Sequence, residues 1–505
     1  MNAPEPTLDI SGKISHDFND ATTTNTDSYS CQSRFQESTA PMKPLRIALL
    51  GYRSHPHVGG QGIYINYLSK ALVNIGHSVD VISGPPYPEL DPRVGLIQLP
   101  SLDLFAAKSH VTALRWRHLK SFSDTYEWFS MLTGGFAEPY TFARRAAKYL
   151  HEQGHNYDLV HDNQCLAYGL LTIEKSGLPV VATVHHPITR DFQLALAAAS
   201  WKHKLLVRRW HSFLHMQGKV VRKLKHVVTV SKQSQKDIVS AFKRPASRTP
   251  IMYNGIDTET FAPMQSVMRE PYLLITTSSA DQPLKGLRFL LKAMALLKSS
   301  YPDLKLQVIG KLKKDGDTEK LLRRLHLSDS VEFISGISTK ALVQEYNRAS
   351  IAVSPSLYEG FGLPAGEAMS CETAVVTSDG GALPEVVGDA GRVVPAGDSR
   401  ALAGAIDELL QDPALRERLG QAARARIVEQ FSWQVKAQRL SSYYYQEVLG
   451  HSAEINDSVD TQAVVAHAIG SDAVVQNPMS SQLPLADASL SHNNKLSEDS
   501  SAAIC

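Results

Sequence analysis

Short apolar runs alternate with helical patterns along most of this chain of 505 residues. The run from Leu45 to Leu50 is bounded by Gly51, and a short continuous apolar run is typical of a strand buried in a parallel sheet. Across 60–74, apolar side chains recur at three- and four-residue spacing, which predicts a helix that ends at Gly76. Strands separated by helices in this way predict a parallel sheet with helices on both faces.

The pattern occurs twice, which predicts two domains. The first series is expected to place strands at 45–50, 78–83, 159–160, 180–184 and 227–230. The second is expected to place strands at 272–276, 306–309, 331–334, 351–354, 374–377 and 391–394. Its helices are expected at 286–300, 317–326, 339–349, 363–370, 399–411 and 413–430. The predicted fold class is therefore α/β, with two doubly wound parallel-sheet domains.

These series divide the chain into five parts. Residues 1–43 and 451–505 are polar and lack a periodic pattern, so they are expected to be disordered tails. Residues 44–248 and 249–432 form the two predicted domains, which meet in a stretch rich in Pro, Gly and Asn. A last helical pattern at 433–450 is expected to return to the first domain. Because parallel sheets bind ligands outside the carboxyl ends of their strands, two such sheets are expected to face a cleft.

Composition narrows the class of protein. With 43% hydrophobic and 20% charged residues, the chain is globular, and a net charge of +2 argues against a nucleic-acid partner. No apolar window approaches the length of a transmembrane helix. The four cysteines stand far apart, which favours reduced thiols and a cytoplasmic protein.

The sharpest chemical motif lies at residues 354–369. A predicted strand ends near Ser354, and a glycine-rich turn leads into a helix that is expected to start near Leu363. Free backbone N–H groups and the positive dipole end make such a helix start suitable for a phosphate. Two carboxylates flank this start, Glu359 before the helix and Glu367 inside it, eight positions later.

This segment resembles the Glu-x7-Glu signature of glycosyltransferase family 4, a family of retaining glycosyltransferases with the GT-B fold. The resemblance covers most of residues 45–450. Further matching motifs occur in the family's order at 58–62, 254–257, 284–287, 308–310 and 431–433. The resemblance implies two Rossmann-like domains facing a cleft, the first binding an acceptor and the second a nucleotide-diphosphate sugar, UDP- or GDP-linked.

The resemblance also implies roles for single residues. Glu367 would hydrogen-bond the donor ribose, and Glu359 would lie beside the sugar at the reacting face. Lys285 would neutralise the charge that develops on the leaving phosphate. Enzymes of this fold usually need no metal or other cofactor. The remaining donor contacts are expected at Gly362, Leu363, Gly310 and Asn254.

One position departs from the family pattern. The family usually has an arginine five residues before the lysine, where this chain has Ala280. Lys311 or Arg288 is expected either to replace the missing charge or to lie on the surface.

The first domain offers candidates on the acceptor side. His161 follows a predicted strand and is expected to face the cleft and touch the sugar or the acceptor, as a catalytic residue. His185 and His186 end the next strand; adjacent residues of an extended strand point to opposite faces, so only one, His185, is expected to line the cleft. Gly59 and Gly60 fit a loop beneath the reacting sugar.

The segment 201–225 is basic and contains Trp201. From residue 193 to residue 236, ten Lys or Arg and no acidic residue occur. A basic amphipathic helix can lie on an anionic membrane, which predicts peripheral contact at its inner face. A solvated helix face and a site for a phosphorylated acceptor are the alternatives.

The function predicted from these features is retaining transfer of a hexosyl group from a nucleotide-diphosphate sugar to a glycan, lipid-linked or small-molecule acceptor. The alternatives are a sugar-nucleotide epimerase, a phosphorylase of the same architecture, or a non-catalytic sugar-nucleotide binding protein. A dinucleotide-dependent dehydrogenase is excluded, because no G-x-G-x-x-G follows the first strand with a carboxylate about 20 residues on.

Overall fold

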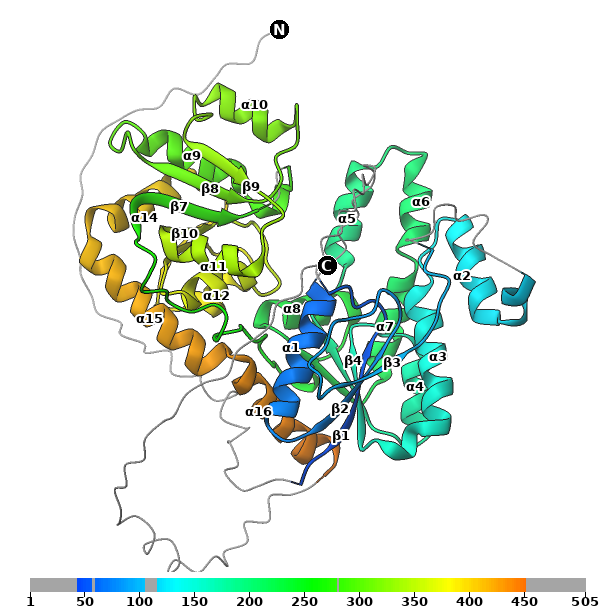
Figure 1. The fold of residues 1–505 in the computed structure, drawn as a ribbon. Helices are drawn as coiled ribbons and strands as arrows, with labels where there is room; N and C mark the ends of the chain where they lie inside the picture. The colour runs from blue at the N-terminus through cyan, green and yellow to red at the C-terminus, as the bar shows by residue number, and fades with distance from the viewer. Residues whose placement is uncertain (1–42, 57–59, 105–115, 279–280, 451–505) are drawn as a thin grey trace, which may run out of the picture.

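The computed structural model describes residues 43–56, 60–104, 116–278 and 281–450, and within them it contains two α/β domains (Figure 1). The predicted tails 1–43 and 451–505 lie outside the described residues, except for Lys43. Each domain is built on one six-stranded sheet in which every neighbouring pair is parallel. The predicted two-domain α/β fold is confirmed.

The first sheet has the strand order β3-β2-β1-β4-β5-β6. Its strands are β1 (Arg46–Gly51), β2 (Ser78–Ser83), β3 (Gly95–Gln98), β4 (Leu159–Asn163), β5 (Val180–Val184) and β6 (His226–Thr229). Its helices are α1 (Gly60–Asn74), α2 (Phe122–Leu132), α3 (Glu138–Gln153), α4 (Tyr168–Lys175), α5 (Thr189–Ala198), α6 (His203–Trp210), α7 (Phe213–Lys223) and α8 (Lys232–Phe242). Strand β3 was not predicted, because this edge strand is half exposed and carries no continuous apolar run.

The second sheet has the strand order β12-β11-β10-β7-β8-β9. Its strands are β7 (Glu270–Thr277), β8 (Lys305–Ile309), β9 (Val331–Ile334), β10 (Ala349–Ser354), β11 (Ala374–Ser378) and β12 (Arg392–Val394). Its helices are α9 (Leu287–Leu297), α10 (Asp317–Arg324), α11 (Thr339–Arg348), α12 (Leu363–Ser370), α13 (Leu383–Val387), α14 (Ser399–Gln411) and α15 (Pro413–Phe431).

Both faces of each sheet are buried, which explains the continuous apolar runs in the sequence. Strand β5 is buried at every position, and so is β11. Apolar residues of β1 alternate between the two cores of the first domain, Leu50 in one and Leu49 in the other. This two-sided burial leaves the carboxyl ends of the strands as the place where polar side chains gather.

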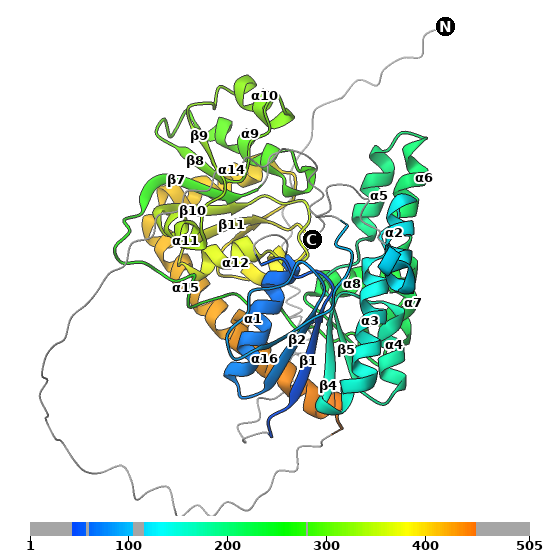
Figure 2. The ribbon, with the colours of Figure 1, turned by 45° about the vertical axis from the view of Figure 1, so that its right-hand side comes forward.

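The last helix, α16 (Trp433–Tyr443), packs on the first domain beside α1, as both ribbon views show (Figures 1 and 2). Its residues Ala437 and Leu440 are fully buried in the core that also contains Leu49. His77 Nε2 lies 2.8 Å from Ser441 Oγ and so joins this helix to the end of α1. The chain therefore crosses between the domains twice.

A second contact between the domains involves the start of α8. The carboxylate of Glu385, in the second domain, accepts hydrogen bonds from the backbone N–H groups of Lys232 and Gln233 at 2.7 and 2.9 Å. The side chain of Ser231, which caps the same helix, donates to the carbonyl of Gly360 at 2.8 Å. A carboxylate at a helix N-terminus is stabilised by the free N–H groups and the helix dipole. These bonds hold the glycine-rich turn against the first domain.

Candidate active site between the two domains

A cavity of about 430 Å³ lies between the two domains. Both domains and the connections between them line it. From the first domain and α16 come Gly60, Gln61, Ile63, Tyr64, Tyr67, Gln164, His185, His186, Val230 and Trp433. From the linker and the second domain come residues 254–257, Phe261, Lys285, Thr339, Leu342, residues 359–364 and Glu367. The carboxyl ends of both sheets therefore open toward the same space, as expected for ligands of parallel sheets.

The start of α12 forms one wall of this cavity. Gly362, the residue before the helix, has φ of 99°, a left-handed conformation that favours glycine. Leu363 and Pro364 begin the helix, and proline at this position removes no hydrogen bond. The first turn of an α-helix has free N–H groups and the positive end of the helix dipole, and in α12 this turn belongs to the cavity wall. Sequence analysis placed Gly362 and Leu363 here, and both line the cavity.

Lys285 and Glu359 form an ion pair at this wall. Lys285 Nζ donates to Glu359 Oε1 at 2.8 Å, and Ser356 Oγ donates to the same oxygen at 2.8 Å. The carboxylate is mostly buried and the ammonium group is one-third exposed. Among the described residues that line the cavity, Lys285 is the one lysine or arginine. The lysine charge of the described cavity wall therefore lies beside the start of α12.

Glu367, within α12, lines the same cavity as the ion pair. Tyr346 Oη donates to its Oε2 at 3.3 Å. Burial raises the pKa of the Glu367 carboxyl to about 7, and the hydrogen bond from Tyr346 acts in the opposite direction. This carboxylate is poised to accept hydrogen bonds from a ligand hydroxyl.

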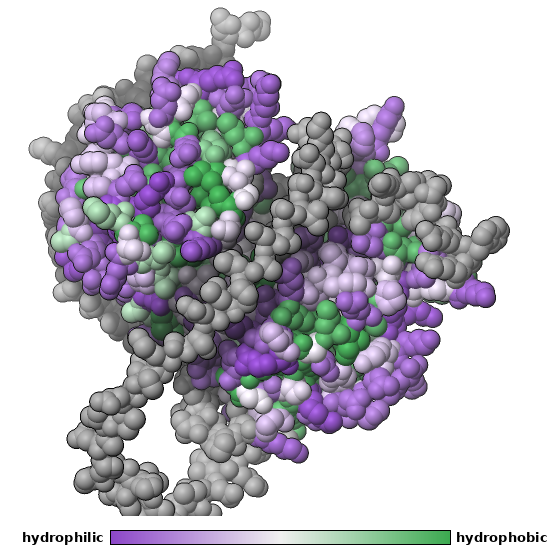
Figure 3. All heavy atoms as spheres, in the orientation of Figure 1, coloured by the Kyte–Doolittle hydropathy of each residue, from purple (hydrophilic) through white to green (hydrophobic). Residues whose placement is uncertain are grey.

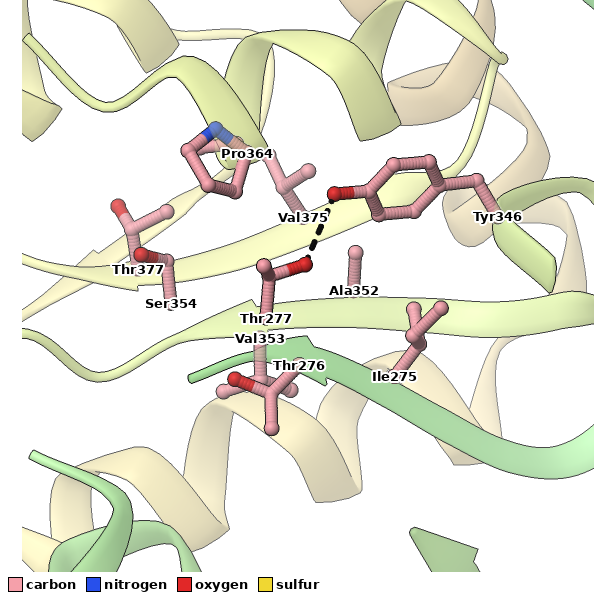
Figure 4. A pocket seen from close by; sticks show the side chains of 11 residues that line it. Ile275, Thr276, Thr277, Tyr346, Ala352, Val353, Ser354, Pro364, Val375 and Thr377 are labelled. Atoms are coloured by element: carbon pink, nitrogen blue, oxygen red, sulfur yellow. Dashed lines mark hydrogen bonds between the residues drawn. The ribbon is translucent and has the colours of Figure 1, made fainter. Parts of the chain in front are cut away.

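Figure 4 shows the layer beneath α12, where the three strands β7, β10 and β11 end. A small cavity of about 10 Å³ lies here, under Pro364. The hydroxyl of Tyr346 points toward Thr277 at the end of β7, and their oxygens lie 3.0 Å apart. A space of this size holds at most about one water molecule, so this layer supports the site above it and is too small for substrate.

Of the other residues expected to contact the donor, one lines the cavity and one does not. Asn254 lies in the linker, lines the large cavity and is 7% exposed, and its Oδ1 has no hydrogen-bond partner among the residues that the structure describes. Such a buried acceptor is costly unless a ligand or water satisfies it. Gly310 follows β8, donates its N–H to the carbonyl of Ile334 at 2.7 Å, and is not among the described residues that line the cavity. Gly60 lines the cavity, and Gly59 lies outside the described residues.

The expectation that His161 faces the cleft is wrong. Its side chain lies in β4, fully buried. Nδ1 is hydrogen-bonded to the Tyr444 hydroxyl, and Nε2 lies 2.7 Å from Thr183 Oγ1. Burial lowers the pKa of His161 to about 3. Both ring nitrogens are thus occupied, Nδ1 by the chain that follows α16 and Nε2 by the neighbouring strand β5. His161 stays inside the sheet because β4 continues through Asn163.

His185 lines the cavity as expected, but so does His186. Strand β5 ends at Val184, so the alternation of an extended strand does not continue through the pair. His185 Nε2 lies 2.7 Å from Asn163 Oδ1, and its ring meets the Tyr64 ring edge-on at 4.5 Å. His186 is therefore a candidate that sequence analysis missed, although its position at a strand end pointed to it.

The charge missing at Ala280 has no replacement among the candidates considered. Ala280 itself lies outside the described residues. Arg288 is exposed and stacks over its neighbour Phe289, and Lys311 is also exposed. Neither is among the described residues of the cavity wall, so both are surface charges.

Aromatic side chains of the first domain and α16 form the opposite wall. Trp433 stacks on Tyr67 with ring centroids 5.6 Å apart and meets Tyr64 at 5.5 Å. Gly255 lies directly against the Trp433 ring, where no larger residue fits. Tyr64 and Tyr67 were missed, because at helical spacing they are indistinguishable from core residues in the sequence.

Comparison with known proteins identifies the family. Residues 58–260 match the family model of Glycosyltransferase Family 4, and residues 260–426 match that of Glycosyl transferases group 1. The MMP alpha-(1->4)-mannosyltransferase of Mycolicibacterium hassiacum is 46% identical over 404 residues, which cover 79% of this chain and 98% of that protein. The D-inositol 3-phosphate glycosyltransferase of Kribbella flavida is 26% identical, with 81% and 97% covered.

Solved structures share the fold. Sucrose-phosphate synthase of Thermosynechococcus elongatus aligns with a TM-score of 0.58 and 24% identity over 80% of this chain and 98% of its own. HepE of Anabaena, solved in complex with UDP, aligns with a TM-score of 0.57 and 17% identity over 80% of this chain and its full length. These likenesses establish the GT-B arrangement of two α/β domains. Together, the two family models and the 46% identical mannosyltransferase show that this chain belongs to the group 1, family 4 glycosyltransferases.

Proposed function

We propose that this glycosyltransferase moves a hexosyl group from a nucleotide-diphosphate sugar to an acceptor with retention of anomeric configuration. The observation that carries the proposal is the ion pair of Lys285 and Glu359 beside the start of α12, within the cavity between the domains. A pyrophosphate suits this wall, because a helix start and an ammonium group both stabilise its oxygens. The solved complex of HepE with UDP-glucose, a protein of the same fold, supports a donor of this class.

Glu359 and Glu367, eight residues apart, take different parts in this proposal. Glu367 accepts hydrogen bonds from the donor ribose, and Glu359 orients Lys285 and the transferred sugar. The bond between the anomeric carbon and the diphosphate breaks, and the acceptor oxygen bonds on the same face. The acceptor proton passes to the leaving phosphate, whose growing charge Lys285 and the helix start stabilise. No metal is needed in this scheme, since the lysine and the helix end carry the compensating charge.

A binding screen tests the donor assignment. Calorimetry with UDP- and GDP-sugars is expected to find at least one donor that binds the wild type, and Glu367→Ala is expected to weaken it about 10- to 100-fold through lost charge-assisted hydrogen bonds. Glu417→Ala, on the exposed face of α15, is the matched control. Unchanged affinity in Glu367→Ala contradicts the donor assignment, and an inverted product by NMR contradicts retention.

We further propose that the protruding hairpin of α5 and α6 contacts an anionic membrane. None of the eight residues of α6 is buried. Trp201, Leu205 and Leu206 are 78, 71 and 52% exposed, beside the exposed Lys202 and the basic side chains that follow. In Figure 3 hydrophobic and hydrophilic residues lie side by side on this hairpin, at the right of the view. Interfacial tryptophan with flanking lysine is typical of peripheral anchors. No helix in the described ranges is long and apolar enough to cross a bilayer.

A partner of opposite charge suits this surface better than a second copy. A two-fold contact would bring the basic residues of both copies together, which like-charge repulsion opposes. The hairpin begins just after His186, so a lipid-bound acceptor would reach the cavity from this side.

Vesicle sedimentation of the full chain tests this proposal. We expect binding to vesicles of phosphatidylcholine and phosphatidylglycerol at 7:3 to exceed binding to phosphatidylcholine alone at least 10-fold, and to fall in about 0.5 M salt. The double variant Trp201→Asp, Leu205→Asp is expected to abolish it, whereas Met268→Asp, at an 87% exposed site in the other domain, is expected not to. Equal binding to both vesicles, or a dimer that the double variant dissociates, overturns the proposal.

A further inference from the structure

We propose that Tyr346 is a positioning residue for the donor: its hydroxyl, held by Thr277, fixes the carboxylate of Glu367 for the ribose of the nucleotide. The inference rests on the proposed function, because that function gives Glu367 its ligand. It assigns a role to a residue of the supporting layer that lies away from the substrate.

Three elements of the second domain meet at these side chains. Tyr346 is near the end of α11, Thr277 is the last residue of β7, and Glu367 lies within α12. Tyr346 Oη donates to Glu367 Oε2 at 3.3 Å and lies 3.0 Å from Thr277 Oγ1. Figure 4 shows the tyrosine hydroxyl reaching across the strand ends to Thr277. These hydrogen bonds therefore join Glu367, at the cavity wall, to the carboxyl end of the central strand β7.

The donor and acceptor in each of these two hydrogen bonds follow from the number of hydrogens that each group carries. A phenol has one hydrogen, and a carboxylate can only accept. When Tyr346 donates to Glu367, its oxygen is free to accept, and the Thr277 hydroxyl supplies the donor. Thr277 therefore orients Tyr346, and Tyr346 orients Glu367.

Tyr346 is itself held rigidly. Its side chain is 1% exposed, and its ring packs against Phe261 with centroids 6.2 Å apart. Its carbonyl accepts a hydrogen bond from Thr373 Oγ1 at 2.7 Å. Tyr346 does not line the large cavity, so within the described part of the chain it acts on a ligand through Glu367. A rigid donor behind a carboxylate reduces the rotamer freedom that binding would otherwise remove.

The bond also affects protonation. Burial holds the pKa of Glu367 near 7, and the hydrogen bond from Tyr346 favours the ionised form. Removing that bond raises the pKa further, so more of the carboxyl is protonated at neutral pH. A protonated carboxyl has lost acceptor capacity for the two ribose hydroxyls.

Measuring nucleotide binding by the Tyr346→Phe variant distinguishes a role in positioning Glu367 from a role in packing alone. Calorimetry from pH 6 to 9 with UDP and GDP, and with their 2′,3′-dideoxy forms, is the measurement. We expect the variant to bind the preferred ribonucleotide about 10-fold more weakly, with little change for the dideoxy form and with a pH midpoint moved upward. Thr277→Val is expected to change the same quantities in the same direction, by less. Tyr272→Phe, at a 43% exposed tyrosine of β7, is the matched control.

The outcomes are distinguishable. Equal weakening for ribo and dideoxy forms means that Tyr346 only supports the fold, and unchanged affinity means that it has no role; either result overturns the inference. If the wild type binds neither UDP nor GDP, the proposed function itself fails, and the inference fails with it. A melting temperature within a few degrees of the wild type shows that the variant is folded.

Discussion

Lys285→Ala is expected to lower kcat about 100- to 1000-fold, the cost of removing one preorganised group that stabilises transition-state charge. Lys285 is the one lysine or arginine among the described cavity residues, and it lies 2.8 Å from Glu359 beside the start of α12. Its loss removes this positive charge from the described cavity wall and leaves the mostly buried carboxylate of Glu359 without its ion-pair partner. Steady-state transfer with the donor found by calorimetry is the measurement.

The control for this prediction is Lys311→Ala, which removes an exposed lysine outside the cavity wall. Lys285→Arg keeps the charge but changes its geometry, so it is expected to retain more activity than the alanine variant. A kcat for Lys285→Ala within threefold of the wild type would show that the helix start alone carries the leaving group.

Replacing His161 by alanine is expected to reduce the free energy of unfolding by about 3 kcal/mol or more and to leave the chemistry of any folded enzyme intact. His161 is fully buried, and the variant leaves the hydroxyls of Tyr444 and Thr183 without their partner. A cavity adds to the cost. Thermal unfolding and kcat at a temperature where the variant is folded are the two measurements.

The pH dependence of unfolding gives a second readout of the same variant. Burial lowers the pKa of His161 to about 3, whereas an unfolded histidine titrates near 6.5. Its contribution to stability is therefore present above about pH 6.5 and is lost as the pH falls toward 3, because only the unfolded chain takes up the proton. His161→Ala is expected to lose this part of the acid sensitivity, and Tyr444→Phe, which keeps the histidine, is expected to retain it. If His161→Ala instead lowers kcat and leaves the free energy of unfolding unchanged, His161 has a catalytic role and the prediction is wrong.

Lys285 and His161 show which parts of the site can be predicted from the sequence and which cannot. Glu359 drew attention because a strand, a glycine-rich turn and a helix start are local in the chain, whereas the role of Lys285 came from the resemblance to glycosyltransferase family 4. His161 was misplaced because the strand that contains it continues three residues further than expected, through Asn163. His186 was missed for the opposite reason, since β5 ends one residue before His185. An error of one to three residues at a strand end decides whether a side chain enters the core or the cleft.

Tyr346 and Trp433 illustrate what no local pattern contains. Tyr346 is separated from Glu367 by a whole strand and turn, and its role depends on the phenol reaching both that carboxylate and Thr277. Trp433 stacks on Tyr67 from the opposite end of the folded chain. Such contacts have no period in the sequence, because they depend on how separate elements pack.

By itself, the sequence determined the two parallel α/β sheets, the glycine-rich turn before α12 and the residue types at the cavity wall that the start of α12 forms. These features follow from hydrophobic burial and backbone geometry, which act over a few neighbouring residues. Only the tertiary structure decided which further groups share the cavity: His186, Tyr64, Tyr67 and the wall that α16 completes. The physical reason is that their positions are set by the packing of α16 and the linker between the domains, which bring together residues hundreds of positions apart.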